Sequence, residues 1–155
     1  MNEADFVELQ NLCVCPMKDS TAVFLICKGK TLLMQTDAAF AEIATQAMHG
    51  RAFPRPQTYE LLHTLCRGFE IRLDAVFITD YRDGIYFARL VYSMENELGK
   101  KVLELDARPS DALLQSFLNR TNVFIARKVY DAAEDTTPLL KRAQKRERKN
   151  KGPAL

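Results

Sequence analysis

Four side chains that can take part in chemistry lie within six residues: Asp106, Arg108, Ser110 and Asp111. Two carboxylates this close can hold a divalent ion such as Mg²⁺ or Mn²⁺, and a guanidinium can bind a phosphate or another anion. We therefore take Asp106, Arg108 and Asp111 as candidate catalytic residues, with Asp106 and Asp111 as candidate metal ligands. The alternative is purely structural, because Asp111 can cap a helix while Arg108 pairs with Asp111 or Asp106.

A strand followed by a helix must position these residues. Residues 101–105 alternate between polar and apolar side chains, which is typical of a half-buried strand. Apolar residues then recur at helical spacing: Leu113, Leu114, Phe117 and Leu118. Pro109 suits the first helical position, where its missing N–H loses no hydrogen bond. Asp111 then takes the third position, where we expect its carboxylate to accept backbone N–H bonds.

The remaining sequence predicts further strands and a few helices. We expect strands over residues 6–15, 21–28, 31–36, 72–80, 85–93, 101–105 and 122–126. A helix is expected over 37–48 with Asp37 as its N-cap, and residues 129–143 are weakly helical. Another helix carries one apolar stripe: Leu61, Leu62, Leu65, Cys66 and Phe69. Residues 94–100 read as a polar loop. Strands in runs broken by helices predict an α+β fold with a mixed or antiparallel sheet.

A similar strand-to-helix pattern occurs earlier in the chain. Asp37 follows the strand over 31–36 as Asp106 follows the strand over 101–105. An acid stands five residues after each aspartate, Glu42 in the first case and Asp111 in the second. Each strand also follows a hairpin-like pair of strands. The pattern indicates a duplicated strand-strand-strand-helix unit.

Positive charge is concentrated at the C-terminal end. The net charge is +2, but residues 141–155 carry +6 and residues 1–140 carry −4. We divide the chain into a domain over 1–135 and a basic, flexible tail over 136–155. The basic side chains of this tail are candidates for binding nucleic acid: Lys141, Arg142, Lys145, Arg146, Arg148 and Lys149. A solvated terminal segment is the alternative.

Composition also excludes several classes of protein. The chain of 155 residues shows no export signal and no apolar run that is long enough to cross a membrane. Its four cysteines show no CxxC pair, so a zinc site is not expected. A cytoplasmic location with reduced thiols follows as the expectation. Small domains with exposed strand edges often pair, so a homodimer is included among the expected assemblies.

Several motifs in order resemble the bifunctional nuclease domain family. They are Phe53-Pro54-Arg55-Pro56 before a helix with Leu61-Leu62, Arg72-Leu73-Asp74-Ala75-Val76, residues 86–91, and Asp106-Ala107-Arg108-Pro109-Ser110-Asp111-Ala112 before Val123-Phe124-Ile125. The resemblance covers residues 21–130. It implies an α+β domain, and both DNase and RNase activity are attributed to some members. The family usually has a glutamate where this chain has Phe40, although Glu42 lies close by.

The resemblance makes nuclease chemistry the expected function. Hydrolysis of a phosphodiester needs an activated water and stabilisation of the phosphate charge, which a divalent metal and an arginine clamp supply. Arg55 and Arg108, each followed by a proline, are the candidate phosphate-binding residues. DNA and RNA are the expected partners, without sequence preference, since nothing in the chain resembles a module that reads base edges. The alternative function is a non-catalytic regulatory module that binds protein or nucleic acid.

Overall fold

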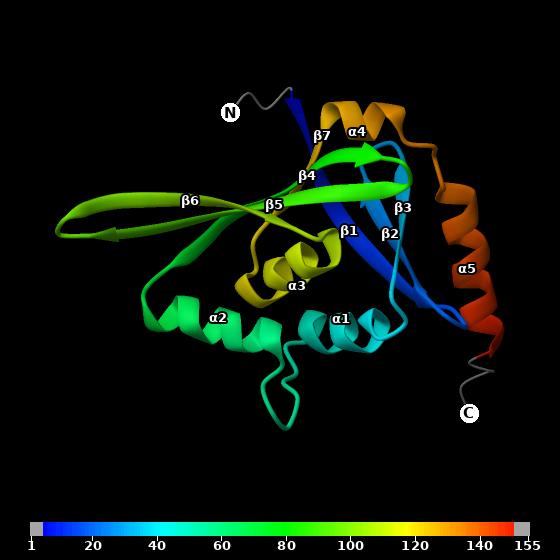
Figure 1. Ribbon diagram of the computed structural model, residues 1–155. Helices are drawn as coiled ribbons and strands as arrows, with labels where there is room; N and C mark the ends of the chain where they lie inside the picture. The colour runs from blue at the N-terminus through cyan, green and yellow to red at the C-terminus, as the bar shows by residue number, and fades with distance from the viewer. Residues whose placement is uncertain (1–4, 151–155) are drawn as a thin grey trace.

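A single seven-stranded sheet forms the centre of the protein (Figure 1). The structure, a computed structural model, describes residues 5–150 and the side chains of residues 5–146. The strands follow the order β3-β2-β1-β7-β4-β5-β6 across the sheet. Their bounds are β1 Phe6–Pro16, β2 Thr21–Cys27, β3 Thr31–Thr36, β4 Arg72–Arg82, β5 Ile85–Asn96, β6 Gly99–Ala107 and β7 Val123–Ala126.

Two antiparallel three-stranded meanders make up most of this sheet. Strands β1, β2 and β3 form the first, and β4, β5 and β6 form the second. Helix α1 (Phe40–Met48) follows the first, and helix α3 (Pro109–Asn119) follows the second. The predicted strand-strand-strand-helix order therefore occurs twice. Strand β7 joins the meanders, because it pairs antiparallel with β1 and parallel with β4. The α+β fold with a mixed, mostly antiparallel sheet is confirmed.

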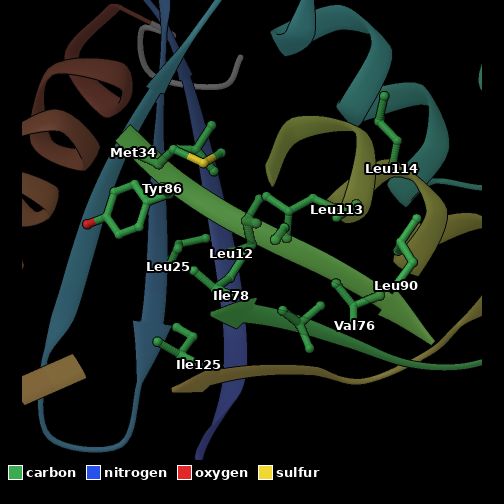
Figure 2. Packing of buried hydrophobic residues seen from close by; sticks show 14 of the residues in the cluster. Leu12, Leu25, Met34, Val76, Ile78, Tyr86, Leu90, Leu113, Leu114 and Ile125 are labelled. Carbon is green, nitrogen blue, oxygen red and sulfur yellow. The ribbon is translucent and has the colours of Figure 1, made fainter. Parts of the chain in front are cut away.

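The main core lies between the sheet and helix α3. Leu113 of α3 points toward the apolar face of the sheet, where Val76, Ile78 and Ile125 are also buried (Figure 2). Leu114 is buried on the side of α3 that faces the neighbouring helix. Helices α1 and α2 (Thr58–Gly68) pack beside α3, and Gln115 Nε2 donates to the backbone oxygen of Tyr59 to join α2 to α3. Burial of these large side chains is the main stabilising contribution to the fold.

A smaller core lies on the opposite face of the first meander. Helix α4 (Arg127–Ala132) follows β7, and helix α5 (Thr137–Asn150) then crosses this face. Leu140 of α5 is buried together with Cys15, Ala22 and Phe24. Residues 137–150, which the sequence places in the basic tail, form this helix, and Leu140 and the nearby Ala143 give it an apolar contact with β2. Residues 151–155 of the tail lie outside the described residues.

Two other expectations differ from the structure. Helix α1 begins at Phe40 rather than at Asp37, although Asp37 Oδ1 still accepts a hydrogen bond from the Phe40 N–H at 3.1 Å. Residues 94–100 are not a loop, because β5 and β6 continue to a tight turn at the end of a long hairpin. Of the apolar stripe on α2, Cys66 is buried, whereas Leu61, Leu62 and Leu65 are exposed.

The five helices of the described residues include none that is long and apolar enough to cross a membrane.

Candidate active site

Both strand-to-helix junctions open into one cavity of about 820 Å³, here called the junction cavity. The first junction contributes Thr36 and Asp37, and the second contributes residues 106–110. The turn between β4 and β5 closes the third side with Tyr81 and residues 84–87. The two equivalent positions of the internal repeat, Asp37 and Asp106, therefore face the same space.

Arg108 is fixed at this cavity by the start of helix α3. Its extended backbone makes it the N-cap residue, and Pro109 occupies the first helical position as predicted. The Asp111 carboxylate accepts bonds from Arg108 Nε at 2.7 Å and from Nη2 at 3.1 Å. This hydrogen bond and the charge of Asp111 raise the pKa of the Arg108 guanidinium, with a smaller contribution from Asp37. Arg108 is therefore a permanent, oriented cation at the cavity.

Asp111 does not have the capping role that its position predicts. Helix α3 shows no side-chain hydrogen bond at its N-cap. Both Asp111 oxygens turn to the Arg108 guanidinium instead, because a carboxylate matches its fork geometry with two parallel bonds. The prediction that Arg108 and Asp111 form one unit is confirmed, whereas the expected backbone contact of Asp111 is wrong. Asp111 therefore holds the Arg108 guanidinium in place.

Asp106 and Asp37 supply the negative charge that lines the junction cavity. The Asp106 side chain is 90% exposed, and one oxygen lies 3.6 Å from Arg89 Nε. Arg89 also binds Glu104 at 2.9 Å. Asp37 is exposed at the end of β3. We did not select Asp37 as a site residue from the sequence, although the internal repeat that relates it to Asp106 carried that signal.

An aromatic and apolar wall faces these charged groups. Tyr81 and Phe87 line the junction cavity and are 43% and 38% exposed, and Ile85 between them is 60% exposed. The rings of Tyr81 and Tyr86 lie with centroids 4.5 Å apart. The sequence predicts the hairpin turn between β4 and β5 but not this aromatic wall. The alternation of polar and apolar residues in β5 does not show that its first residues lie beside the end of β3 in one cavity.

The described residues contain no cluster of three or more His, Cys, Asp or Glu side chains that can hold a metal ion. The expected pair of ligands, Asp106 and Asp111, is weakened by the engagement of Asp111 with Arg108. Asp106 and Asp37 are the carboxylates that share the junction cavity. Two carboxylates are too few for an all-protein cage, so an ion held by them would need water or other oxygen ligands to complete its coordination.

A family model for the bifunctional nuclease domain matches residues 28–137 of the chain. The chain belongs to the bifunctional nuclease domain family. The matched segment runs from the turn before β3 to the first residue of α5, so it includes both junctions and every residue that lines the cavity. No curated protein matches the chain.

Two features of this bifunctional nuclease domain lie away from the cavity. Arg55 is exposed in the connection between α1 and α2, a loop that extends below the two helices in Figure 1, and is not a cavity residue. Lys141, Arg142, Lys145 and Arg146 are exposed on α5, and the side chains of Arg148 and Lys149 lie outside the described residues. The structure therefore does not bring Arg55 and the basic helix into the cavity with Arg108.

The position at which the resemblance predicts a glutamate is part of the core. Phe40 is 2% exposed, at the start of α1, and packs in the main apolar cluster. Glu42 is exposed on α1 and does not line the junction cavity. In this member of the family, the described acids of the cavity are Asp37 and Asp106.

Proposed function

We propose that the protein hydrolyses phosphodiester bonds in DNA and RNA at the junction cavity, without sequence preference. The observation that carries the proposal is the arrangement of Arg108, Asp37 and Asp106 opposite exposed Tyr81 and Phe87, within one cavity. Membership in the bifunctional nuclease domain family supports the reaction class. The mixture of one oriented cation, two carboxylates and aromatic rings suits a flexible anionic chain that carries planar bases.

Each group has a separate task in this proposal. Arg108, held by Asp111, binds the phosphate and stabilises the negative charge that develops on it. The free N–H groups of the first turn of α3 add positive potential at the same place. Asp106 and Asp37 orient the attacking water. Tyr81 and Phe87 stack on unpaired bases, which favours single strands and gives no preference for a base.

The proposal includes a divalent ion, which the carboxylates of Asp37 and Asp106 would bind. Asp37 and Asp106 would hold Mg²⁺ or Mn²⁺ together with substrate phosphate oxygens, and the ion would lower the pKa of a bound water. We therefore expect cleavage to depend on a divalent ion and to stop on chelation.

A non-catalytic nucleic-acid-binding module is the second candidate. Phe40, buried where the resemblance predicts a glutamate, favours it, because the chain then lacks a carboxylate that the family usually has at this junction. This candidate predicts binding at the junction cavity without cleavage.

The test compares labelled single-stranded DNA, duplex DNA and RNA, each incubated with purified protein and Mg²⁺, Mn²⁺ or a chelator. The catalytic proposal expects cleavage that disappears on chelation and in Asp106→Asn. Arg67→Ala is the matched control, since Arg67 is exposed on α2 and does not line the junction cavity. Binding that survives chelation, with no cleavage by any preparation, would establish the binding module instead.

A further inference from the structure

The two edge strands of the sheet differ in how far other parts of the described chain cover them. At the β3 edge, the Thr136 N–H donates to the Thr31 backbone oxygen at 2.8 Å, and Asp135 Oδ1 accepts from the Thr31 N–H at 3.2 Å. The segment before α5 therefore covers the start of this edge. At the other edge, every residue of β6 from Gly99 to Asp106 is exposed. An uncovered edge strand presents backbone donors and acceptors that another strand can pair with.

The uncovered edge is also apolar. Val102 and Leu103 are 59% and 55% exposed, and Leu105 is 40% exposed. Eight of the fourteen large hydrophobic side chains that the described residues expose lie on β6 and the turn before it, or on and beside α2. They are Leu61, Leu62, Leu65, Phe69, Leu98, Val102, Leu103 and Leu105. Exposed apolar groups gathered on a long edge strand are what proteins that remain single chains avoid.

We propose that β6 pairs antiparallel with β6 of a second copy of this chain, so that two sheets become one. Strand β6 runs from Gly99 to Ala107, so full overlap of two such strands places Leu103 opposite itself on the two-fold axis. The same register places Lys100 opposite Asp106 of the partner subunit, and Lys101 opposite Leu105. The strand carries its lysines at one end and Asp106 at the other, so antiparallel pairing, and not parallel pairing, matches opposite charges.

The exposed side of α2 fits the same arrangement. Leu103 lies opposite Tyr92 in the hairpin, and directly opposite residues share a face of a sheet. The Tyr92 hydroxyl approaches Gln115 of α3, so Leu103 is on the face that carries α2 and α3. A two-fold axis perpendicular to the joined sheet keeps both α2 helices on this face. Their leucines then flank the paired strands, where the partner copy excludes water from them.

The pairing also reaches the junction cavity. Asp106 lines the cavity and ends β6, and the register brings Lys100 of the partner subunit opposite it. Each cavity would therefore receive one cation from the other copy at its rim. This assembly does not depend on catalysis, because it rests on the edge, the apolar groups and the charges of β6.

The oligomeric state of the full chain tests the proposal. We expect sedimentation equilibrium to give twice the mass of a single chain. Leu103→Lys places two like charges opposite each other on the axis, so we expect the dimer dissociation constant to rise by about tenfold or more. Leu65→Lys on α2 should weaken the dimer less than this. Circular dichroism of both variants checks that each remains folded.

Two further variants make the register itself testable. In Leu103→Cys the two new thiols face each other, and opposite residues in an antiparallel pair lie at roughly disulfide distance, so oxidation should link two chains. Val102→Cys, opposite Glu104, should link far less. Lys100→Glu should weaken the dimer, and Lys100→Glu combined with Asp106→Lys should restore it.

The results that would overturn the proposal are equally specific. A parent protein that stays a single chain at all concentrations contradicts it. A dimer that resists Leu103→Lys and shows no Leu103→Cys link uses another surface. A dimer that Leu65→Lys abolishes while Leu103→Lys does not would assign the interface to α2 alone.

Discussion

Arg108 and Asp111 form a two-point ion pair across the first turn of α3, with Nε–Oδ2 and Nη2–Oδ1 distances of 2.7 and 3.1 Å. The pair is open to solvent, since the side chains are 72% and 47% exposed. An ion pair in this setting contributes little to stability. Its effect is to hold a flexible guanidinium in one orientation at the junction cavity.

The first prediction is that Arg108→Ala lowers the cleavage rate by about tenfold or more, because a cation that stabilises the phosphate charge in the transition state is lost. Initial rates on labelled single-stranded DNA measure it. Arg55→Ala should lose less, because Arg55 does not line the cavity. Equal losses from both variants would support one shared anion site, and no loss from either would remove Arg108 from the mechanism.

Arg82 is unsuitable as a control, because its guanidinium lies 4.6 Å from the ring centroid of Phe87 in the cavity wall.

The second prediction separates positioning from stability at Asp111. Asp111→Ala should destabilise the fold by only about 0.2–1 kcal/mol, since an exposed ion pair and no backbone cap is lost. It should nevertheless lower the rate, because Arg108 becomes free to turn away. Thermal melting and initial rates are measured on the same preparation. A large fall in melting temperature would mean that Asp111 caps the helix after all.

The third prediction concerns the aromatic wall. Tyr81→Ala and Phe87→Ala should each weaken binding of a single strand by about 1–3 kcal/mol, the usual effect of losing one stacked base. Fluorescence anisotropy at fixed salt concentration measures the affinity. Phe53→Ala in the α1–α2 connection should leave it unchanged, as Phe53 does not line this cavity. Binding of duplex DNA should respond less than binding of single strands.

The sequence predicts best where local rules decide the structure. Strand β3 has the bounds that its composition and flanking Gly29 and Asp37 indicate, and Pro109 occupies the first helical position. Predictions from the sequence fail where contacts between residues far apart in the chain decide which side chains are buried. The leucines of α2 show helical periodicity, but periodicity does not show that no other part of the described chain buries them. The β5–β6 hairpin has polar residues like a loop, since both of its faces are exposed near the tip.

The candidate site was predicted in part. Asp106, Arg108 and Asp111 were found because a compact motif places them together in the chain. The Arg108–Asp111 ion pair joins residues three apart in the chain, and pairing of Arg108 with Asp111 or Asp106 is the structural alternative that the sequence predicts. Asp37 and the aromatic wall come from other strands, and their meeting with Arg108 depends on how the two meanders are joined through β7. The spacing of residues along the chain does not show how β7 joins the two meanders.

The fourth prediction uses two adjacent leucines of α5. Leu140 is 6% exposed and Leu139 is 45% exposed. Leu140→Ala should destabilise the protein by about 2–5 kcal/mol, because it leaves a cavity against β2. Leu139→Ala should have little effect in the same denaturant titration. Removal of residues 147–155 should preserve the fold and reduce the salt dependence of nucleic-acid binding. If Leu140→Ala melts like the parent, α5 is not a structural part of the domain.

The fifth prediction is a loss of stability at alkaline pH. Burial raises the pKa of the Cys27 thiol from its ordinary value of 9.0 to about 11, and Lys30 opposes this shift. The unfolded chain therefore ionises first, so the contribution of Cys27 is complete below pH 9 and is lost as pH rises to about 11. The free energy of unfolding as a function of pH should fall less steeply in Cys27→Ala than in the parent protein.

Strand β7 sets the order in which the fold can be completed during synthesis. Both meanders and their connecting segments have been made once Ala107 has left the ribosome, yet the four residues that lie between β1 and β4 come later, at Val123–Ala126. In that interval the two half-sheets each hold an unpaired inner edge within the same nascent chain. The nascent chain would therefore gain its full resistance to proteases only after Ala126 emerges.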